Sequence, residues 1–295
     1  MTFEAREARR GLFAGFGAYL IWGLLPLYLR QLIGVPAEDV LAHRIVWSLL
    51  VMAFVTTVSA GWPRLKAALG RPRLLMLLFG SAVFITCNWL IYTWSILNGH
   101  VLDTSLGYFI NPLISVVFGV MLLGERLSWP QWLAVGCAAA GVVVLAIGHG
   151  ELPLISLGLA LSFALYGLIR KQAQVDAVTG LFIETLFLAP IALGWLLTRP
   201  VGGFAVPAPT LLLLMAGGVL TAVPLMLFGV AARRLKLSTL GLMQYFSPSL
   251  VFLQGIFLFH EPIDGWQMFA FASIWLGLAI YSLSLARSGS GARSA

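Results

Sequence analysis

Long apolar runs separated by short polar segments dominate the chain. Most runs are close to the ~20 residues that an α-helix needs to cross the hydrocarbon core of a bilayer. The segments between them carry glycine, proline or charge, as in Gly34-Val35-Pro36 and Arg71-Pro72-Arg73. Unpaired backbone groups are costly in lipid, and runs of this length do not fit barrel strands, so each run is predicted to be a helix. The pattern predicts an all-α integral membrane protein with ten transmembrane helices, over residues 11–33, 40–59, 74–97, 102–123, 130–148, 152–170, 178–197, 209–231, 238–259 and 266–286.

The composition supports the same fold class. Of the 295 residues, 60% are hydrophobic and only 10% are charged, whereas soluble domains carry about 25% charged residues. So few charges could not cover a soluble domain, which excludes most soluble enzymes. The net charge of +7 does not indicate a nucleic-acid partner, because Lys and Arg lie in short loops between apolar runs. Cys87 and Cys137 lie inside apolar runs and predict neither a disulfide framework nor a metal site.

The positive charges predict the orientation. If the N-terminus is cytoplasmic, the cytoplasmic segments hold all but three of the 18 Lys and Arg residues, as the positive-inside rule requires. The exceptions are Arg199 in an outer loop and Arg30 and Arg44 near the outer ends of two spans. The first run is too long for a signal peptide and is expected to be retained. Both tails, residues 1–10 and 287–295, are therefore predicted to be cytoplasmic.

The two halves of the chain resemble each other. The segment Leu106–Pro112 in the fourth span has a counterpart in Leu242–Pro248 in the ninth. Each half has five predicted spans, so the second half must enter the membrane in the opposite sense. We predict two inverted repeats, residues 11–148 and 152–286. Many secondary transporters have this architecture and bind their substrate near the midplane between the halves; duplication without transport is the alternative.

Two of the charged residues within the predicted spans are candidates for function. Glu184 is surrounded by apolar residues, where a carboxylate is costly unless it faces a cavity, pairs or is protonated. It is a candidate substrate or proton-coupling residue, or else a structural hydrogen-bonding group. Arg44 could bind a carboxylate or phosphate through two hydrogen bonds, or could extend to the outer headgroups. If both reach one cavity from opposite sides, they would suit a zwitterion, with Glu184 exchanging a proton.

Polar and aromatic residues also recur on helical faces. We expect them to line the substrate cavity, with hydrogen bonding between helices as the alternative. They are Tyr19, Trp22, Asn88, Trp89, Tyr92, Tyr108, Asn111, Tyr166, Gln244 and Tyr245. Pro112 and Pro248 are predicted to bend their helices. Ser115 and Ser162 are expected to link helices. The small residues Gly136, Ala138, Ala139, Ala140 and Gly141 predict close helix packing, and a homodimer contact is one candidate for it.

The motifs in these spans resemble those of a known family. They include His43-Arg44-Ile45-Val46-Trp47-Ser48, Leu123-Gly124-Glu125-Arg126, Leu165–Lys171 and Leu237–Gly241, in this order and spacing. The chain resembles a RarD-type member of the EamA family, in the drug/metabolite transporter superfamily. The resemblance implies two inverted EamA repeats in a bacterial inner membrane, with the fifth and tenth spans as peripheral scaffold.

The predicted function is secondary active transport of a small organic metabolite or drug, as a permease or exporter with alternating access. No phosphate-binding loop is present, so the chain is not expected to use ATP. We expect no cofactor and no metal. The rival functions are a membrane-embedded enzyme, which would need clustered catalytic groups, and a channel-like facilitator.

Overall fold

The computed structural model describes residues 3–32, 34–97, 101–149, 154–199, 203–258 and 264–291. Within these ranges the chain is helical and contains no β-strand. The helices are α1 Phe3–Leu29, η1 Arg30–Leu32 (a 3-10 turn), α2 Ala37–Val58, α3 Trp62–Leu69, α4 Pro72–Leu97, α5 Val101–Leu123, α6 Trp129–His149, α7 Leu154–Gln172, α8 Ala177–Thr198, α9 Ala208–Arg234, α10 Leu237–Met243, α11 Phe246–Phe257 and α12 Gly265–Gly291.

Seven stretches of helix in the described ranges are long and apolar enough to cross a membrane: Ala5–Leu32, Ala37–Val58, Pro72–Tyr92, Trp129–Gly148, Leu154–Gln172, Ala177–Thr198 and Ala208–Arg234. Two further apolar stretches are shorter, Gly107–Leu123 in α5 and Met268–Tyr281 in α12. The predicted all-helical, multi-pass membrane fold is therefore confirmed. The number of ten spans and the inversion of the halves remain predictions.

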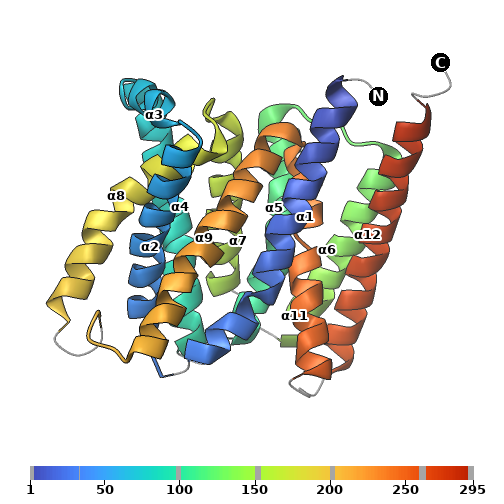
Figure 1. Ribbon diagram of the computed structural model, residues 1–295. Helices are drawn as coiled ribbons and strands as arrows, with labels where there is room; N and C mark the ends of the chain where they lie inside the picture. The colour runs from blue at the N-terminus through green and yellow to red at the C-terminus, as the bar shows by residue number, and fades with distance from the viewer. Residues whose placement is uncertain are drawn as a thin grey trace.

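The helices form one bundle in which both chain ends lie at the same end as α3 (Figure 1). The helices α2, α4, α7, α8 and α9 pack on one another around the largest buried apolar cluster. At one edge of the bundle, α6 runs beside α12 (Figure 1). Their backbones are close, because a Cβ on Gly277 would lie 2.7 Å from the carbonyl oxygen of Ala134. Packing against α12 thus uses part of the small-residue surface of α6, and a homodimer remains a prediction.

The sequence pattern did not predict α3, which lies between the second and third predicted spans. Pro63 occupies the start of this helix, where its missing N–H costs nothing. Leu65 and Ala68 are buried, whereas Arg64 and Lys66 are exposed. With eight residues, α3 is too short to span a bilayer and is an amphipathic segment at the end of the bundle.

The ninth predicted span, 238–259, is a broken helix rather than a continuous one. It divides at Gln244 and Tyr245 into α10 and α11. Pro248 explains the position of the break, since a proline has no N–H to donate to the carbonyl four residues earlier and its ring clashes with that carbonyl. The carbonyl is that of Gln244, which instead accepts from the N–H of Ser247 at 3.1 Å. By contrast, α5 continues through Pro112 without a break.

Candidate functional site

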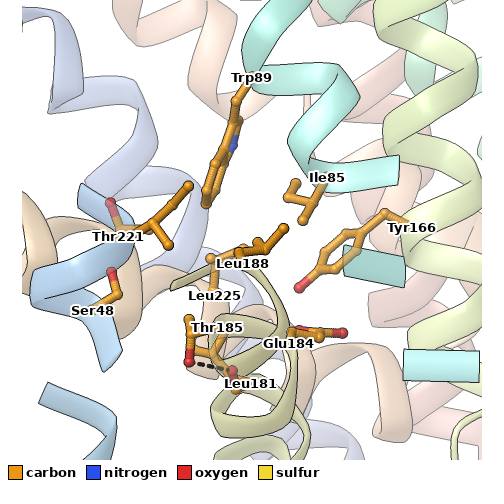
Figure 2. A pocket seen from close by; sticks show the side chains of 11 residues that line it. Ser48, Ile85, Trp89, Tyr166, Leu181, Glu184, Thr185, Leu188, Thr221 and Leu225 are labelled. Carbon is orange, nitrogen blue, oxygen red and sulfur yellow. Dashed lines mark hydrogen bonds between the residues drawn. The ribbon is translucent and has the colours of Figure 1, made fainter. Parts of the chain in front are cut away.

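A small cavity lies between α2, α4, α7, α8 and α9, and we call it the central cavity. Its polar or aromatic lining residues are Ser48, Trp89, Tyr166, Glu184, Thr185 and Thr221, and its apolar ones are Ile45, Ile85, Leu181, Leu188 and Leu225. Figure 2 shows Tyr166 and Glu184 on one side, Ser48 and Thr221 on the other, and Trp89 reaching in from above. The free space is about that of one water molecule. This conformation is therefore closed around the cavity.

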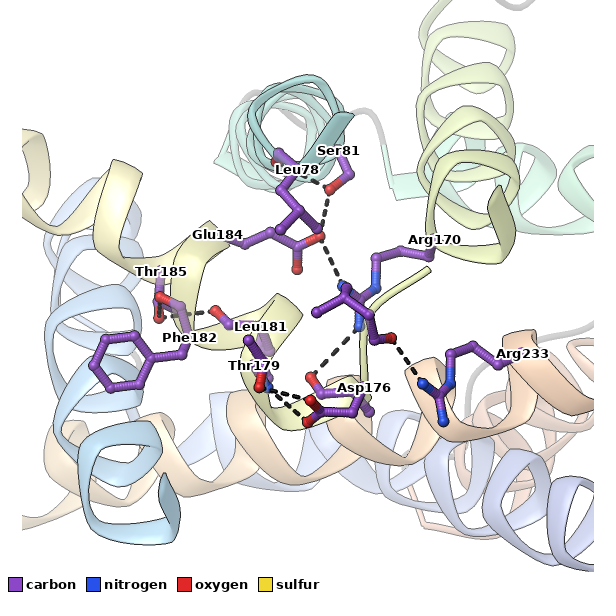
Figure 3. A network of polar contacts seen from close by, with 12 residues as sticks. Leu78, Ser81, Arg170, Asp176, Thr179, Leu181, Phe182, Glu184, Thr185 and Arg233 are labelled. Atoms are coloured by element: carbon purple, nitrogen blue, oxygen red, sulfur yellow. Dashed lines mark hydrogen bonds and ion pairs between the residues drawn. The ribbon is translucent and has the colours of Figure 1, made fainter. Parts of the chain in front are cut away.

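Glu184 is held in a buried ion pair that joins three helices. Its Oε1 lies 3.4 Å from Nη1 of Arg170 on α7, and the two side chains are 2% and 1% exposed. The same oxygen accepts a hydrogen bond from the hydroxyl of Ser81 on α4 (Figure 3). Breaking such a pair from one side leaves a buried uncompensated charge, which typically costs about 3–5 kcal/mol. The pair therefore holds α4, α7 and α8 together.

Small residues make room for the Arg170 guanidinium. A Cβ on Gly180 of α8 would lie 2.1 Å from Nη1 of Arg170, and one on Gly229 of α9 would lie 2.7 Å from Nη2. The Nη2 group also donates to the carbonyl of Ala177 at 3.5 Å. The two glycines thus allow a cation to lie between α8 and α9 deep in the protein.

The turn before α8 fixes the start of the helix that carries Glu184. Asp176 caps α8, accepting hydrogen bonds from the backbone N–H of Thr179 at 3.0 Å and from its hydroxyl at 2.6 Å (Figure 3). Partial burial raises the pKa of Asp176, but these hydrogen bonds and the nearby charges of Arg64 and Arg233 together lower it below its ordinary value. Asp176 is therefore an anionic helix cap.

Polar atoms around the central cavity lack partners within the described part of the chain. They are Oε2 of Glu184, Nε of Arg170 and the hydroxyl of Tyr166. Buried polar groups are normally hydrogen-bonded, and exceptions are found where a ligand, a water or a conformational change supplies the partner. The orphaned atoms of Glu184 and Tyr166 therefore mark the cavity as a candidate binding site.

Arg44 lies behind the opposite wall of this cavity. Its side chain is buried, with 8% of the residue exposed, and Nε donates to Oγ1 of Thr221 on α9 at 2.8 Å. Its guanidinium carbon lies 5.0 Å from the ring centroid of Trp89, a distance typical of a cation–π contact. The predicted alternative, extension to the headgroups, does not describe this conformation, because the side chain contacts two cavity-lining residues.

The two predicted asparagines link helices in this conformation. Nδ2 of Asn88 on α4 donates to the carbonyl of Leu159 at 2.9 Å and to Oγ of Ser162 at 3.1 Å, both on α7. Nδ2 of Asn111 on α5 donates to the carbonyl of Ala160 at 2.6 Å. Their amides therefore attach α4 and α5 to α7, which was the predicted alternative to a cavity role.

A second small cavity, nearer the end of α10, brings together Tyr19 and Gln244. Tyr19 donates to the carbonyl of Leu240 at 2.9 Å, and its ring lies 5.6 Å from that of Trp22. Tyr245 lies at the break of the ninth predicted span and donates to the carbonyl of Phe109 at 3.0 Å. The structure thus divides the predicted site residues between two cavities and the helix contacts around them.

The start of α10 is capped by a residue from the other half of the chain. Glu125, in the loop after α5, accepts from the backbone N–H groups of Leu237 at 2.6 Å and Ser238 at 3.1 Å. It also accepts from the hydroxyl of Ser238 at 2.7 Å, and Nζ of Lys171 lies 4.0 Å from its Oε1. These contacts attach the loop after α5 to the start of α10 and to the end of α7.

Comparison with known proteins decides the family. The model of the EamA-like transporter family matches residues 9–147. A Vibrio cholerae protein named uncharacterized transporter is 43% identical, over 100% of this chain and 99% of its own. Protein RarD of Escherichia coli is 43% identical, over 94% of this chain and 95% of its own. The chain is a RarD-type member of the EamA family. The predicted family is thereby confirmed.

Two more distant matches complete the comparison. A Pseudomonas aeruginosa protein named chloramphenicol-sensitive protein RarD is 32% identical, over 96% of each chain. A crystal structure with 22% sequence identity superposes with a TM-score of 0.70 and covers 94% of this chain and 98% of its own. At that identity the crystal structure shows a shared fold alone.

Sequence reasoning missed the partner of Glu184 in this RarD-type protein. The positive-inside pattern counts Arg170 among the residues of a cytoplasmic segment, at the end of the sixth predicted span. The spacing of Arg170 and Tyr166 could have revealed the pairing. The two residues are four apart in one helix, so Arg170 lies on the same face as a predicted cavity residue. A buried carboxylate needs a cation at its own depth, and Arg170 was the available cation in the neighbouring span.

Proposed function

We propose that this chain is a secondary transporter of a small organic solute and works by alternating access. In this proposal the central cavity is the substrate site, and residues 11–148 and 152–286 are two inverted repeats that rock around it. Membership in a family of transporters supports the general function. The single observation that carries the rest is the closed central cavity between helices of both halves, with buried polar atoms that have no partner among the described residues.

The packing of the helices supports the two repeats. If α1, α2, α4, α5 and α6 correspond to α7, α8, α9, the α10–α11 pair and α12, each contact between the two halves should recur with its members exchanged. The contact of α1 with α9 recurs as that of α4 with α7, and the contact of α2 with α9 recurs as that of α4 with α8. Likewise, the contact of α1 with α11 recurs as that of α5 with α7. Such exchange is expected of a repeated unit.

Polar contacts follow the same exchange. A hydroxyl of α4, that of Ser81, binds Glu184 on α8. A hydroxyl of α9, that of Thr221, binds Arg44 on α2. These two pairs would be equivalent under the proposed repeat, with a carboxylate in one half replaced by a guanidinium in the other.

The proposed cycle opens one end of the bundle at a time. The cap that Glu125 places on α10 would close the end with the chain termini, and its release would open that end. The excess of Lys and Arg supports a cytoplasmic location for this end. The bacterial relatives support placement in the inner membrane.

Glu184 is proposed as the coupling residue. Its Oε2 is buried beside the cavity without a partner in the described ranges. Its Oε1 pairs with Arg170, which balances the charge of the carboxylate. Taking up a proton would weaken that ion pair and thereby change how α7 and α8 hold together. Binding of a proton would in this way be linked to movement of one half.

A membrane-embedded enzyme and a channel are the competing functions. Counterflow in proteoliposomes separates them. Liposomes with and without protein are loaded with one unlabelled member of a panel of organic acids, amino acids, nucleosides and chloramphenicol, and the same labelled compound is added outside. A carrier gives a transient, saturable accumulation of label. Non-saturating flux without accumulation would instead indicate a channel, and conversion of the compound would indicate an enzyme.

A further inference from the structure

Arg44 and Glu184 differ in how their charges are balanced. Glu184 has Arg170 as a partner at 3.4 Å. Arg44 has a hydroxyl and an indole ring as its partners, and no carboxylate pairs with it among the residues that the structure describes. Among the described side chains around the central cavity, the buried charges of Arg44, Arg170 and Glu184 add up to one net positive charge, and that charge belongs to Arg44.

An unbalanced guanidinium in a membrane interior is costly. The hydrogen bond to Thr221 uses only Nε, one of the three nitrogens of the guanidinium. The contact with Trp89 offsets part of the cost, since an indole face attracts a cation. Neither contact supplies a negative charge. The remaining N–H groups form a planar fork that matches a carboxylate.

The residues around Arg44 could accommodate the apolar part of an organic anion whose carboxylate binds the guanidinium. Tyr28, Tyr92 and Tyr108 all lie near the Arg44 guanidinium. The rings of Tyr92 and Tyr108 lie 5.8 Å apart and both side chains are partly exposed. Arg44 thus has the Trp89 ring and these tyrosines nearby. Aromatic rings can receive an apolar skeleton, and tyrosine hydroxyls can hydrogen-bond its anionic end.

We infer that the substrate is an organic monoanion whose carboxylate binds Arg44 and whose apolar part lies against Trp89. The inference rests on the proposed function and narrows its substrate class. It replaces the zwitterion expected from the sequence, because Glu184 already has a cation and so offers no free negative charge to an ammonium group. Thr221 positions the guanidinium by accepting from Nε. The cavity must open before such a ligand binds, since it now has room for about one water molecule.

A series of ligands with one skeleton and different charges tests the inference. The melting temperature of the purified full chain is measured with 3-phenylpropionate, phenylalanine, 3-phenylpropylamine and 3-phenylpropan-1-ol. Butyrate and benzoate are added as further carboxylates, with sodium chloride at equal ionic strength as the control. Ligands that bind only the folded state raise its stability. We expect saturable shifts with carboxylates and none with the amine, the zwitterion or the alcohol.

Variants locate the binding group. Arg44→Gln should weaken carboxylate binding at least tenfold, and Arg44→Lys should weaken it less, because it keeps the charge and loses the fork. Arg30→Gln makes the same change in net charge at an exposed position and should leave binding unchanged. If Arg44→Gln does not fold, the inference is tested by the carboxylate affinity of Arg44→Lys relative to wild type and by the ligand series on the wild-type protein.

Three results would overturn the inference: a shift with the amine or zwitterion as large as with the carboxylates, no shift with any carboxylate, or unchanged carboxylate affinity in Arg44→Gln. Its failure differs from failure of the proposed function. If the protein catalyses counterflow of a neutral compound but binds no carboxylate, the transport proposal stands and the anion-site inference fails. If it binds carboxylates but shows no counterflow, the anion site stands and the transport proposal fails.

Discussion

Arg170 and Glu184 form an ion pair in the interior of the protein, with 3.4 Å between Nη1 and Oε1 and almost no exposure of either side chain. Because the two residues come from adjacent helices, α7 and α8, the pair links the elements on one side of the central cavity. Its energetic role can be measured by removing one partner or both.

Glu184→Leu alone should lower the free energy of unfolding by about 3–5 kcal/mol, because Arg170 is left buried and unpaired. Adding Arg170→Met should recover most of the loss, since no charge then remains. Chemical unfolding in detergent measures both. Glu7→Gln, which breaks the partly exposed pair of Glu7 with Arg234, is the control and should change little. A single variant as stable as wild type would show that the pair has no structural role.

The contribution of Glu125, which caps α10, to the stability of the protein should also be measurable. Glu125→Ala removes the acceptor of two backbone N–H groups and one hydroxyl, and loss of a helix cap typically costs about 0.5–2 kcal/mol. Arg126→Ala is the control, because that side chain is exposed in the same loop. Equal melting temperatures for the two variants would contradict the role assigned to Glu125.

Asn88→Ala and Asn111→Ala should each destabilise the protein by roughly 0.6 kcal/mol, the average for hydrogen bonds between membrane helices. Each change leaves a carbonyl of α7 without its side-chain donor. Both variants should also slow counterflow, since α4 and α5 then move more independently of α7. Thr198→Ala, which removes an exposed hydrogen bond within α8, is the matched control. Normal stability with lost transport would instead favour a direct cavity role for the asparagines.

The lowered pKa of Asp176 predicts a dependence of stability on pH. A carboxyl with a depressed folded-state pKa stabilises the protein above its unfolded value, which is ordinarily 3.8, and this contribution is lost as pH falls through the folded value. Asp176→Asn should therefore reduce the loss of stability in acid. Melting temperatures of the two proteins from neutral pH downward provide the comparison. Parallel curves would show that Asp176 is not a source of the dependence.

Much of the architecture follows from apolar periodicity, because helices are the structures that satisfy their backbone within a single apolar run. The short helix α3 and the break at Gln244 were not anticipated. An eight-residue amphipathic helix such as α3 contains no long apolar run that a span search would detect. The similar segments that contain Pro112 and Pro248 also behave differently, because the helix breaks near Pro248 but continues through Pro112. Such differences depend on tertiary contacts.

The candidate site was predicted less completely than the fold. The pattern identified Arg44, Trp89, Tyr166 and Glu184, all of which lie at or beside the central cavity. It could not show that Asn88 and Asn111 bind α7, since a polar stripe has the same spacing whether it faces a cavity or another helix. Pairing of Arg170 with Glu184 depends on the rotation of two helices, which spacing along the chain does not give.

Alternating access is the central claim of the account, and reciprocal labelling of the cavity tests it most directly. Ser48→Cys is placed in a chain with Cys87→Ala and Cys137→Ala, and a small impermeant thiol reagent is applied to right-side-out and inverted vesicles. Lys66→Cys, exposed on α3, reports which side is accessible. The rates are then compared with and without Glu125→Ala. The account predicts that Glu125→Ala speeds labelling from the side of the chain termini and slows it from the other side. Faster labelling from both sides, or no labelling from either, would contradict it.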